Sequence, residues 1–582
     1  MKYFALHLSI GIYAIRIEGV LPEQVRQPLR GLSVQLAMQE LKDLEMTSLS
    51  FSGVIFAGLV LAASLADGDA FAQGNQRTVV GGTVVGAAGR DPRILVFKGI
   101  PYAAAPVGHW RWRPPQSVKE WNGVKSAREL RPSCIGRNFG SIAKSDMSED
   151  CLYLNIWTPS TKTGPRYEVL VWIHGGGFQG GGGYHPTYDG EEFAKHGVVV
   201  VTFNYRVGVF GFLAHLELTK ESDAHASGNY GLLDQVAALR WVQHNIAQFG
   251  GDPDKVTIAG ESAGAYSVSA LTASPMSRGL FRAAIAESGG YLVPKRDAMR
   301  SLTDSESIGM NFARSLGIVD IAGLRATSAD DLMKAVEQMP DFFAFQPCID
   351  GAFLSEPVYT TYSKHQESRV PVLIGSNTDE GAFLLPPQRS SVKELQTRLD
   401  ETFGVNSHLV RTAYPTETAA KLLRSELDLY GDDGFNYPMW KWAELHSQAG
   451  LPVYYYVFGR VLSTLPVQSY KGIPRNKIGA FHGDEVPYVF GNLDLVASNA
   501  LDGAPRKGRW ETVDYSLSKT MLTYWVNFVK AGNPNGTDVP KWPRYEESAN
   551  NPLMHFDSHA EVGPDERASR LRLLDSAFQP EL

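Results

Sequence analysis

The sequence predicts an α/β fold with a large, mostly parallel central sheet flanked by helices. Five apolar runs of strand length are rich in Val, Ile and Tyr and lack in/out alternation, which is typical of buried strands in a parallel sheet. Helical stretches and Gly-rich turns separate the runs, as expected for strand, crossover helix, strand units. The expected strands are Val169–Ile173, Val198–Phe203, Val256–Gly260, Val370–Gly375 and Val453–Phe458.

The clearest helix lies between the second and third of these strands, at Asn229–Gly250. Its apolar residues recur at helical spacing and a pair of glycines ends it. A second helix is expected at Ala265–Ser274, directly after the third strand. Long insertions around residues 295–345 and 385–450 are expected to act as lids. No Pro/Gly/Ser linker divides this part of the chain, so we expect residues 73–582 to form a single domain.

Composition limits the possible classes of protein. The chain has 582 residues, of which 43% are hydrophobic and 20% are charged, which is ordinary for a globular protein with a large core. Its formal net charge is −7 and it has no block of basic residues. Nucleic acid is therefore an improbable ligand, since its phosphates require clustered Lys and Arg. No short repeat or low-complexity tract divides the chain.

The segment Phe51–Gln73 resembles a secretory signal, with an apolar run, small residues and the cleavage pattern Ala70-Phe71-Ala72. The run is shorter than the ~20 residues of a membrane span, so no stable membrane anchor is expected. Residues 1–72 are thus predicted to be an extension and signal peptide that is removed, with a mature start near Gln73. A secreted or periplasmic protein is expected; a cytoplasmic or tethered one is the alternative. Met1, Met38 and Met46 all remain possible start residues.

A serine between two glycines is the strongest chemical signal. Gly260-x-Ser262-x-Gly264 follows an expected strand and precedes an expected helix, which is the context of a nucleophile elbow. The glycines permit a sharp turn that exposes the Ser262 hydroxyl, and the helix N-terminus places partial positive charge beneath it. A serine nucleophile also requires a general base and donors for an oxyanion.

The donors are expected in the sequence IHGGGF, Ile173–Phe178, which follows another strand. Three glycines without side chains allow two backbone N–H groups to point into a cavity, where they join the N–H of Ala263. The alternative is a phosphate-binding loop. That alternative requires a following helix and, for a P-loop, a Gly-Lys-Ser/Thr ending, whereas QGGGGYHPTYDG follows here.

The base is expected to be a histidine that follows the serine and an acid in the chain. His482 lies in a Gly-flanked loop after the strand at Val453–Phe458, where a loop can carry an imidazole over the sheet. His408 is the second choice. The acid is expected in the loop after the strand at Val370–Gly375, where spacing does not distinguish Asp379 from Glu380. The acid would orient the imidazole through Nδ1–H.

Nine blocks in colinear order, over about residues 78–560, resemble the type-B carboxylesterase family, the cholinesterase and carboxylesterase group. The blocks are FKGIPYAAAPVG, EDCLYLNIW, HGGGF, NYRVGVFGF, GNYGLLDQ, GESAGA, GSNTDEG, HGDEVPYVFG and FVKAGNPNG. The resemblance implies the α/β-hydrolase fold and a serine carboxylesterase that acts on small-molecule esters. It implies neither a metal nor an organic cofactor.

The resemblance also assigns roles to individual residues. It makes Ser262 the nucleophile, His482 the base and Glu380, rather than Asp379, the acid. Its further site residues are the oxyanion hole of Gly176, Gly177 and Ala263, and two supporting groups: Glu261 as a buried modulating carboxylate and Ser288 as a hydrogen-bonding helper near the triad.

The three cysteines are too few for a disulfide scaffold and none has the CxxC spacing of a structural zinc site. The resemblance pairs Cys134 with Cys151 and leaves Cys348 as a free thiol; three buried thiols are the alternative. The loop between Cys134 and Cys151 lacks the tryptophan that binds choline in cholinesterases, so no choline site is expected. An amidase or carbamate hydrolase, and a non-catalytic cholinesterase-like binding module, are the alternative functions.

Overall fold

The computed structural model describes residues 75–138, 144–160, 164–294, 299–386, 388–461, 469–496, 509–546 and 552–578. Asn75–Leu582 form one compact unit. The expected signal segment Phe51–Gln73 lies outside the described residues, so its removal stays a prediction. Among the described residues, no helix combines the length and apolarity needed to cross a membrane.

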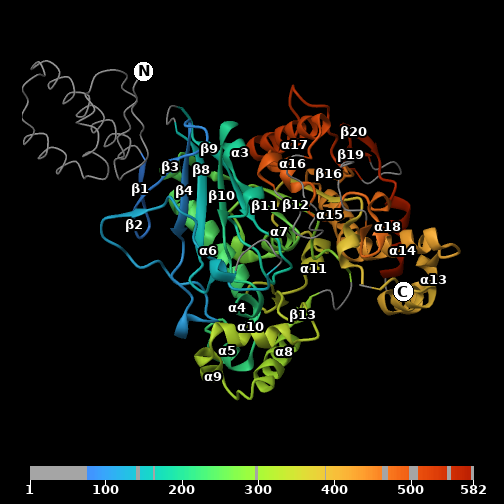
Figure 1. Cartoon of the computed structure of the whole chain (residues 1–582), viewed down its shortest axis with the longest axis horizontal. Helices are drawn as coiled ribbons and strands as arrows, with labels where there is room; N and C mark the ends of the chain where they lie inside the picture. Colours follow the sequence, from blue (N-terminus) through green and yellow to red (C-terminus); the bar gives the residue numbers. More distant parts are fainter. Residues whose placement is uncertain are drawn as a thin grey trace, which may run out of the picture. The chain divides into compact units, whose positions relative to one another are not determined.

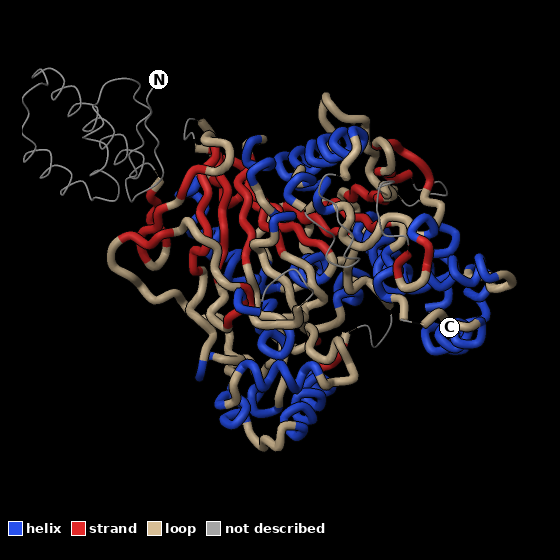
Figure 2. The backbone as a smooth tube through the Cα atoms, in the orientation of Figure 1, coloured by secondary structure: helices blue, strands red, loops and turns tan. Residues whose placement is uncertain are grey.

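The central sheet has 11 strands within the described residues, and it crosses the fold from the N-terminal to the C-terminal half of the chain (Figures 1 and 2). In spatial order the strands are β20 (Ala560–Pro564), β19 (Pro552–Phe556), β16 (Val453–Phe458), β15 (Val372–Asn377), β12 (Ala283–Glu287), β11 (Gly251–Glu261), β9 (Tyr167–Ile173), β10 (Val198–Phe203), β8 (Tyr153–Pro159), β4 (Ile94–Pro101) and β3 (Ala87–Ala88).

The middle of the sheet is parallel and its edges are antiparallel. Neighbouring strands from β10 through β9, β11, β12, β15 and β16 to β19 run parallel. At the edges, β8 pairs antiparallel with β10 and β4, and β20 pairs antiparallel with β19. The prediction of a mostly parallel sheet is therefore confirmed, and the strands that carry the candidate site belong to its parallel part.

All five expected strands are present, and three have shifted bounds: β9 begins earlier than expected, β11 extends further at both ends, and β15 begins and ends later. β10 and β16 have the expected bounds, whereas β15 begins at Val372 rather than Val370 and continues to Asn377. Pro371 has no N–H for the ladder, and the carbonyl of Val370 accepts a hydrogen bond from His446 Nε2 at 2.8 Å. The strand therefore starts later and ends closer to Glu380.

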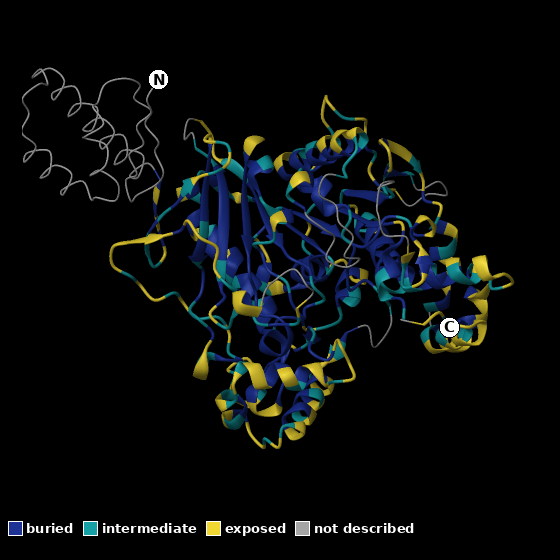
Figure 3. Cartoon of the chain, in the orientation of Figure 1, coloured by how far each residue is buried: buried dark blue, intermediate teal, exposed yellow. Residues whose placement is uncertain are grey.

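Both faces of the sheet are covered, which explains the absence of alternation in the strands. Along β9, Val169, Val171 and Ile173 face one core and Leu170 and Trp172 face the other. The central strands β10, β12, β15 and β16 are buried along their whole length (Figure 3). One face carries α6 (Tyr230–Asn245), α7 (Ala263–Ala273) and α15 (Tyr437–Gln448), and the opposite face carries α3 (Glu191–Lys195), α16 (Val486–Phe490) and α17 (Thr512–Ala531).

The expected helices are present with small shifts at their ends. The helix expected at Asn229–Gly250 is α6 followed by a 3-10 turn at Ile246–Phe249, and Gly250 ends it with φ +82°. The helix expected at Ala265–Ser274 is α7, which begins two residues earlier because Ser262 is its N-cap. α7 packs against β9, β11 and β12, and α6 packs against β11.

The two expected insertions are largely helical. The first contains α8 (Leu302–Ser315), α9 (Ile321–Ala326) and α10 (Ala329–Glu337), which gather beside α5 (Leu216–Glu221) away from the sheet (Figure 1). The second contains α12 (Val392–Phe403), α13 (Ser407–Val410), α14 (Ala419–Gly431), the π-helix η10 (Asp432–Asn436) and the start of α15. The C-terminal α18 (Ala568–Phe578) packs against this second group.

Candidate active site

Ser262 lies in a strained turn between β11 and α7. Its φ of +55° and ψ of −125° are rare for a residue with a side chain. A Cβ at Gly264 would lie 2.0 Å from the carbonyl oxygen of Ile173, so only glycine permits this close passage of the chain. The Ser262 amide donates to the Glu287 carbonyl at 2.9 Å, and its side chain is partly exposed. This geometry matches the predicted elbow.

His482 and Glu380 form a buried pair beside this turn. His482 Nδ1 lies 2.6 Å from Glu380 Oε2, and the two residues are 3% and 0% exposed. The other carboxylate oxygen, Oε1, accepts from the Ser288 hydroxyl at 2.5 Å and from the Asn377 amide at 2.6 Å. The carboxylate is thus held on both oxygens, so it can fix the orientation of the imidazole.

The second imidazole nitrogen lies near a second carboxylate. His482 Nε2 is 3.1 Å from Glu261 Oε1. Burial raises the pKa of Glu261 to about 7, with the Glu380 charge adding to the effect and His482 opposing it. Burial acts to lower the pKa of His482, but the charges of Glu261 and Glu380 outweigh it, so this pKa is raised. The imidazolium is therefore stabilised by carboxylates at both nitrogens.

The loop expected to supply oxyanion donors lies against the serine. A Cβ at Gly175 would lie 3.1 Å from Ser262 Cβ. Gly176 and Gly177 have φ of +110° and +60°, and the carbonyl of Gly176 accepts from Gln179 and Gly180, which closes the turn. Within the described residues, the amides of Gly176, Gly177 and Ala263 donate to no protein acceptor. They are thus available to an oxygen of a bound molecule.

The structure does not bring the alternative candidates, Asp379 and His408, to this cluster, nor a further histidine, His446. Asp379 points to Arg424, at 2.5 Å, and to the Gly479 amide rather than to His482. His408 is exposed in α13 and its Nδ1 lies 2.9 Å from the carbonyl of Val405. His446 is buried in α15, where burial lowers its pKa to about 4.

Two further buried carboxyl groups were missed by sequence reasoning. Glu287 Oε1 accepts from Trp525 Nε1 at 2.8 Å, and Glu485 Oε2 accepts from Asn377 Nδ2 at 2.5 Å. Burial raises the pKa of Glu287 to about 8 and that of Glu485 well above its ordinary value. The charge of Glu261 adds to the raised pKa of each of these two groups. In the sequence, Glu287 directly precedes Ser288, and Glu485 follows His482 by three residues. These positions were the available signals that the two residues belong to the site.

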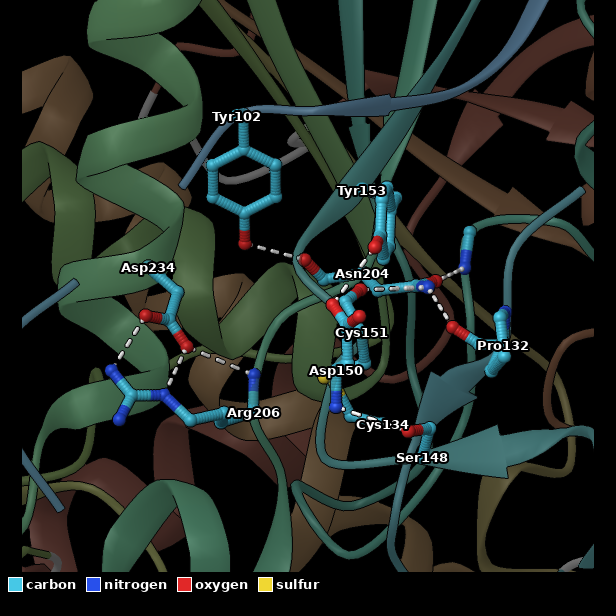
Figure 4. Close-up of a disulfide and its surroundings, with 11 residues drawn as sticks. Tyr102, Pro132, Cys134, Ser148, Asp150, Cys151, Tyr153, Asn204, Arg206 and Asp234 are labelled. Carbon is cyan, nitrogen blue, oxygen red and sulfur yellow. Dashed lines mark hydrogen bonds and ion pairs between the residues drawn. A yellow bond between two sulfur atoms is a disulfide. The ribbon is translucent and has the colours of Figure 1, made fainter. Parts of the chain in front are cut away.

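The predicted disulfide is present. Cys134 and Cys151 are bonded with a Cα–Cα distance of 4.9 Å, and Cys348 is a buried free cysteine. Asn204 donates from Nδ2 to the carbonyls of Pro132 and Cys151, so the disulfide and the chain after β10 are tied together (Figure 4). The Gly-rich loop also contacts this region, since Arg137 donates its amide to the carbonyl of Gln179 at 2.6 Å.

Among the described residues, no group of three or more His, Cys, Asp or Glu side chains is arranged to hold a metal ion. The chemistry that the described groups do support is nucleophilic. A partly exposed hydroxyl, a carboxylate-oriented imidazole and unpaired amides converge at one end of the parallel strands.

Comparison with known proteins identifies the group to which this arrangement belongs. The model of the carboxylesterase family matches residues 73–574. The chain is 39% identical to the fumonisin B1 esterase of Sphingopyxis macrogoltabida, over 82% of this chain and 85% of that protein. It is 36% identical to the para-nitrobenzyl esterase of Bacillus subtilis (strain 168), over 82% and 94%.

The fold is similar to that of solved esterases. A solved structure of PNB esterase matches with a TM-score of 0.72 and 34% identity, and it covers 86% of this chain and 99% of that one. The sheet and its flanking helices therefore form an α/β-hydrolase fold, and the matched region includes every residue of the candidate site. This chain belongs to the carboxylesterase family and is a carboxylic ester hydrolase.

Proposed function

We propose that Ser262, His482 and Glu380 are the catalytic triad of this esterase. The observation that carries the proposal is the 2.6 Å contact between His482 Nδ1 and a Glu380 carboxylate held on both oxygens, beside a serine at φ +55°. An acid that fixes the imidazole and stabilises its protonated form is what a serine nucleophile requires.

In the proposed reaction, Ser262 Oγ attacks the ester carbonyl while His482 Nε2 takes its proton. The oxyanion of the tetrahedral intermediate accepts hydrogen bonds from the amides of Gly176, Gly177 and Ala263. His482 then gives the proton to the departing alcohol, which leaves an acyl group on Ser262. Water, activated by the same imidazole, releases the carboxylic acid.

Glu261 has a modulating role in this proposal. His482 Nε2 lies 3.1 Å from Glu261 Oε1, and the proposed mechanism requires it to reach Ser262 Oγ, a hydrogen bond of the kind that tightens in a substrate complex. The carboxylate stabilises the imidazolium after proton transfer, because opposite charge at this distance favours the charged form.

A labelling experiment tests the nucleophile. A fluorophosphonate should modify the peptide that contains Ser262 in stoichiometric amount and abolish ester hydrolysis. Ser262→Ala should remain folded, take up no label and lose about 10⁶-fold in kcat, because the triad acts as a unit. A label on another serine, or more than a few per cent of activity in folded Ser262→Ala, would remove Ser262 from the mechanism.

A comparison of turnover rates among different carboxylic esters can identify the preferred substrate. The relatives are named for fumonisin B1 and para-nitrobenzyl esters, and we propose a small-molecule ester of this kind as the substrate. A panel should include p-nitrophenyl acetate, a para-nitrobenzyl ester, fumonisin B1 and matched amides and carbamates. Faster turnover of the amides or carbamates than of every ester would favour the amidase or carbamate hydrolase alternative.

We also propose that the protein is exported, to the periplasm or the medium, without a stable membrane anchor. The Cys134–Cys151 disulfide supports this proposal, because such bonds persist in oxidising compartments. Fractionation of the producing cell, with the N-terminus of the recovered protein determined, tests it. Recovery of the full-length chain in the cytoplasm with reduced cysteines would overturn it.

A further inference from the structure

The imidazole of His482 contacts two phenyl rings, whose centroids lie 5.8 Å apart, so they pack against it from neighbouring sides. The Phe383 ring lies 4.7 Å from it, centroid to centroid, at an interplanar angle of 19°. The Phe435 ring lies 4.5 Å from it at 38°. We call Phe383 and Phe435 the aromatic pair. Its two members come from different parts of the chain: Phe383 follows Glu380 in the same 3-10 helix, η7 (Glu380–Leu384), whereas Phe435 belongs to the π-helix η10.

The π-helix is the unusual element here. It interrupts what is otherwise one continuous helix from α14 to α15. Such single turns are rare because their hydrogen-bond geometry is less favourable, and they occur frequently at functional sites. The extra residue in the turn changes the direction in which side chains point, and at this turn the buried Phe435 ring meets the imidazole.

Side chains from several elements hold the π-helix in place. Asp432, at its start, accepts from Tyr414 Oη at 2.9 Å and from Arg570 Nε at 2.6 Å. The Gly434 carbonyl accepts from Tyr266 Oη, on the helix that follows Ser262, at 2.5 Å. Phe435 is therefore braced both from the C-terminal segment and from the helix behind the proposed nucleophile.

A second anchor joins the end of the π-helix to the strand that precedes the acid. Asn436 Oδ1 accepts from Ser376 Oγ at 2.9 Å and from Arg567 Nη1 at 3.1 Å. Ser376 lies in β15, four residues before Glu380. These hydrogen bonds therefore connect the element that carries Phe435 to the strand that precedes Glu380. Both groups that contact the imidazole are held by one set of hydrogen bonds.

The two kinds of contact constrain different motions of the imidazole. Glu380 holds Nδ1 and sets the rotation of the ring within its plane, but a single hydrogen bond permits the plane to tilt. The two phenyl rings that pack against the imidazole from neighbouring sides oppose that tilt. Stacking on aromatic faces also favours the protonated imidazole, because each face carries partial negative charge.

We propose that Phe435 is a positioning residue for ester hydrolysis, which acts through the imidazole of His482 by fixing the plane of the ring and by favouring its protonated form. This inference rests on the proposed function of His482 as the general base. The role differs from core packing, because a ring that only fills space has no effect on the pH dependence of the reaction.

The charged groups around the imidazole come from several elements. Glu261 approaches from the end of β11, Glu380 from η7 and Asp484 from the loop that carries His482 itself. The π-helix adds Asp432 and Asp433, which pair with Arg570 and Arg398 respectively. A change at Phe435 leaves these groups in place, so an altered pH profile reports on the ring.

The experiment compares Phe435→Leu, Phe435→Tyr and a control, Phe403→Leu. Phe403 is also buried and packs on an aromatic ring, that of Phe578 at 4.8 Å, in another part of the second insertion. Steady-state hydrolysis of p-nitrophenyl acetate is measured against pH. Phe435→Leu should lose about 10-fold in kcat with KM within about 2-fold, since the nucleophile–base alignment is impaired and substrate binding is not.

The pH profile supplies the distinguishing result. Loss of the Phe435 ring lowers the pKa of the imidazolium, so the acid limb of kcat/KM should move to lower pH in Phe435→Leu. Phe435→Tyr should restore both kcat and the position of the limb, and Phe403→Leu should change neither. If Phe435→Leu does not fold, Phe435→Met, which is closer in volume, takes its place.

Wild-type kcat and an unmoved acid limb in a folded, non-aromatic variant would overturn the inference. An equal loss in Phe403→Leu, or no recovery in Phe435→Tyr, would overturn it as well. His482→Ala, measured in parallel, separates this failure from failure of the proposed function. Activity in His482→Ala rejects the general base itself, whereas an inactive His482→Ala beside a wild-type Phe435→Leu rejects only the positioning role.

Discussion

At the scale of single residues, the candidate site depends on which of two adjacent acids meets the imidazole. Asp379 and Glu380 are both buried, but they point in opposite directions: Asp379 to Arg424 and Glu380 to His482. The divergence arises where β15 ends and η7 begins, since Asp379 is the N-cap of that 3-10 helix and Glu380 is its first residue.

We expect Glu380→Gln to lose about 10⁴-fold in kcat, because an amide neither stabilises the imidazolium nor holds the required tautomer. Asp379→Asn is the matched control and should lose far less, since Asp379 does not contact the imidazole. Both variants are measured with p-nitrophenyl acetate after their folding is verified. A larger loss in Asp379→Asn would reverse the assignment of the acid.

A second residue-scale prediction concerns Gly177. We expect Gly177→Val to lose about 10²-fold or more in kcat, because a side chain at φ +60° is strained and would meet Phe343 Cε1 at 3.2 Å beside the proposed oxyanion donors. Gly317→Val is the control: its φ of +70° imposes similar backbone strain, but its Cβ points into open space. Equal kcat in the two folded variants would remove the loop from the oxyanion hole.

At the scale of elements, the disulfide links the strand pair β6 (Ser133–Cys134) and β7 (Met147–Ser148) to the start of β8. The cysteines are 17 residues apart in sequence, and the chain-entropy model gives ~3 kcal/mol of stabilisation for a loop of about this length. The bond therefore restrains a segment that contacts the Gly-rich loop through Gly136 and Arg137.

Thiol titration in denaturant, without reductant, should detect one reactive group in the mature protein, from Cys348. Burial raises the pKa of Cys348 to about 12, so this thiol should react only after unfolding. Cys348→Ser should reduce the count to zero. Three reactive thiols in unreduced protein would contradict the disulfide and weaken the proposal of export.

At the scale of the whole molecule, several ionisable groups are enclosed in the core between sheet and helices. Glu287 is fully buried at the end of β12, in contact with Trp525 of α17, and burial raises its pKa to about 8. In the unfolded chain a glutamic acid titrates near ~4.3. Between these two values the folded state binds the proton and the unfolded state releases it, so the free energy of unfolding falls as pH rises.

Glu287→Gln should remove this dependence while it retains an acceptor for Trp525. Relative to wild type, we expect the free energy of unfolding of Glu287→Gln to increase by at least about 1 kcal/mol between pH 5 and pH 9, because each unit of pKa shift corresponds to ~1.4 kcal/mol. Urea unfolding at a series of pH values measures the difference. Parallel pH dependences in the two proteins would show that Glu287 does not carry the shift.

Much of the molecule follows from local patterns in the sequence. The apolar runs became β9, β10, β11, β15 and β16 because strands covered on both faces require apolar side chains throughout. The glycines around Ser262 and in the HGGGF loop indicated a close approach of backbones, which the 2.0 Å distance from a Gly264 Cβ to the Ile173 oxygen explains. The family resemblance, which depends on motif order, identified the type of enzyme.

What the sequence determined by itself, then, is the fold class, the ester hydrolase activity and the residue types available for catalysis, since these depend on periodicity and motif. The tertiary structure alone decided which groups meet. It directed Asp379 away from the imidazole, buried Glu287 and Glu485 in the core, and placed Phe435 against the imidazole from more than 40 residues away in the chain. Such contacts depend on how crossover helices and insertions pack over the sheet, and residues distant in sequence leave no local pattern that records their proximity.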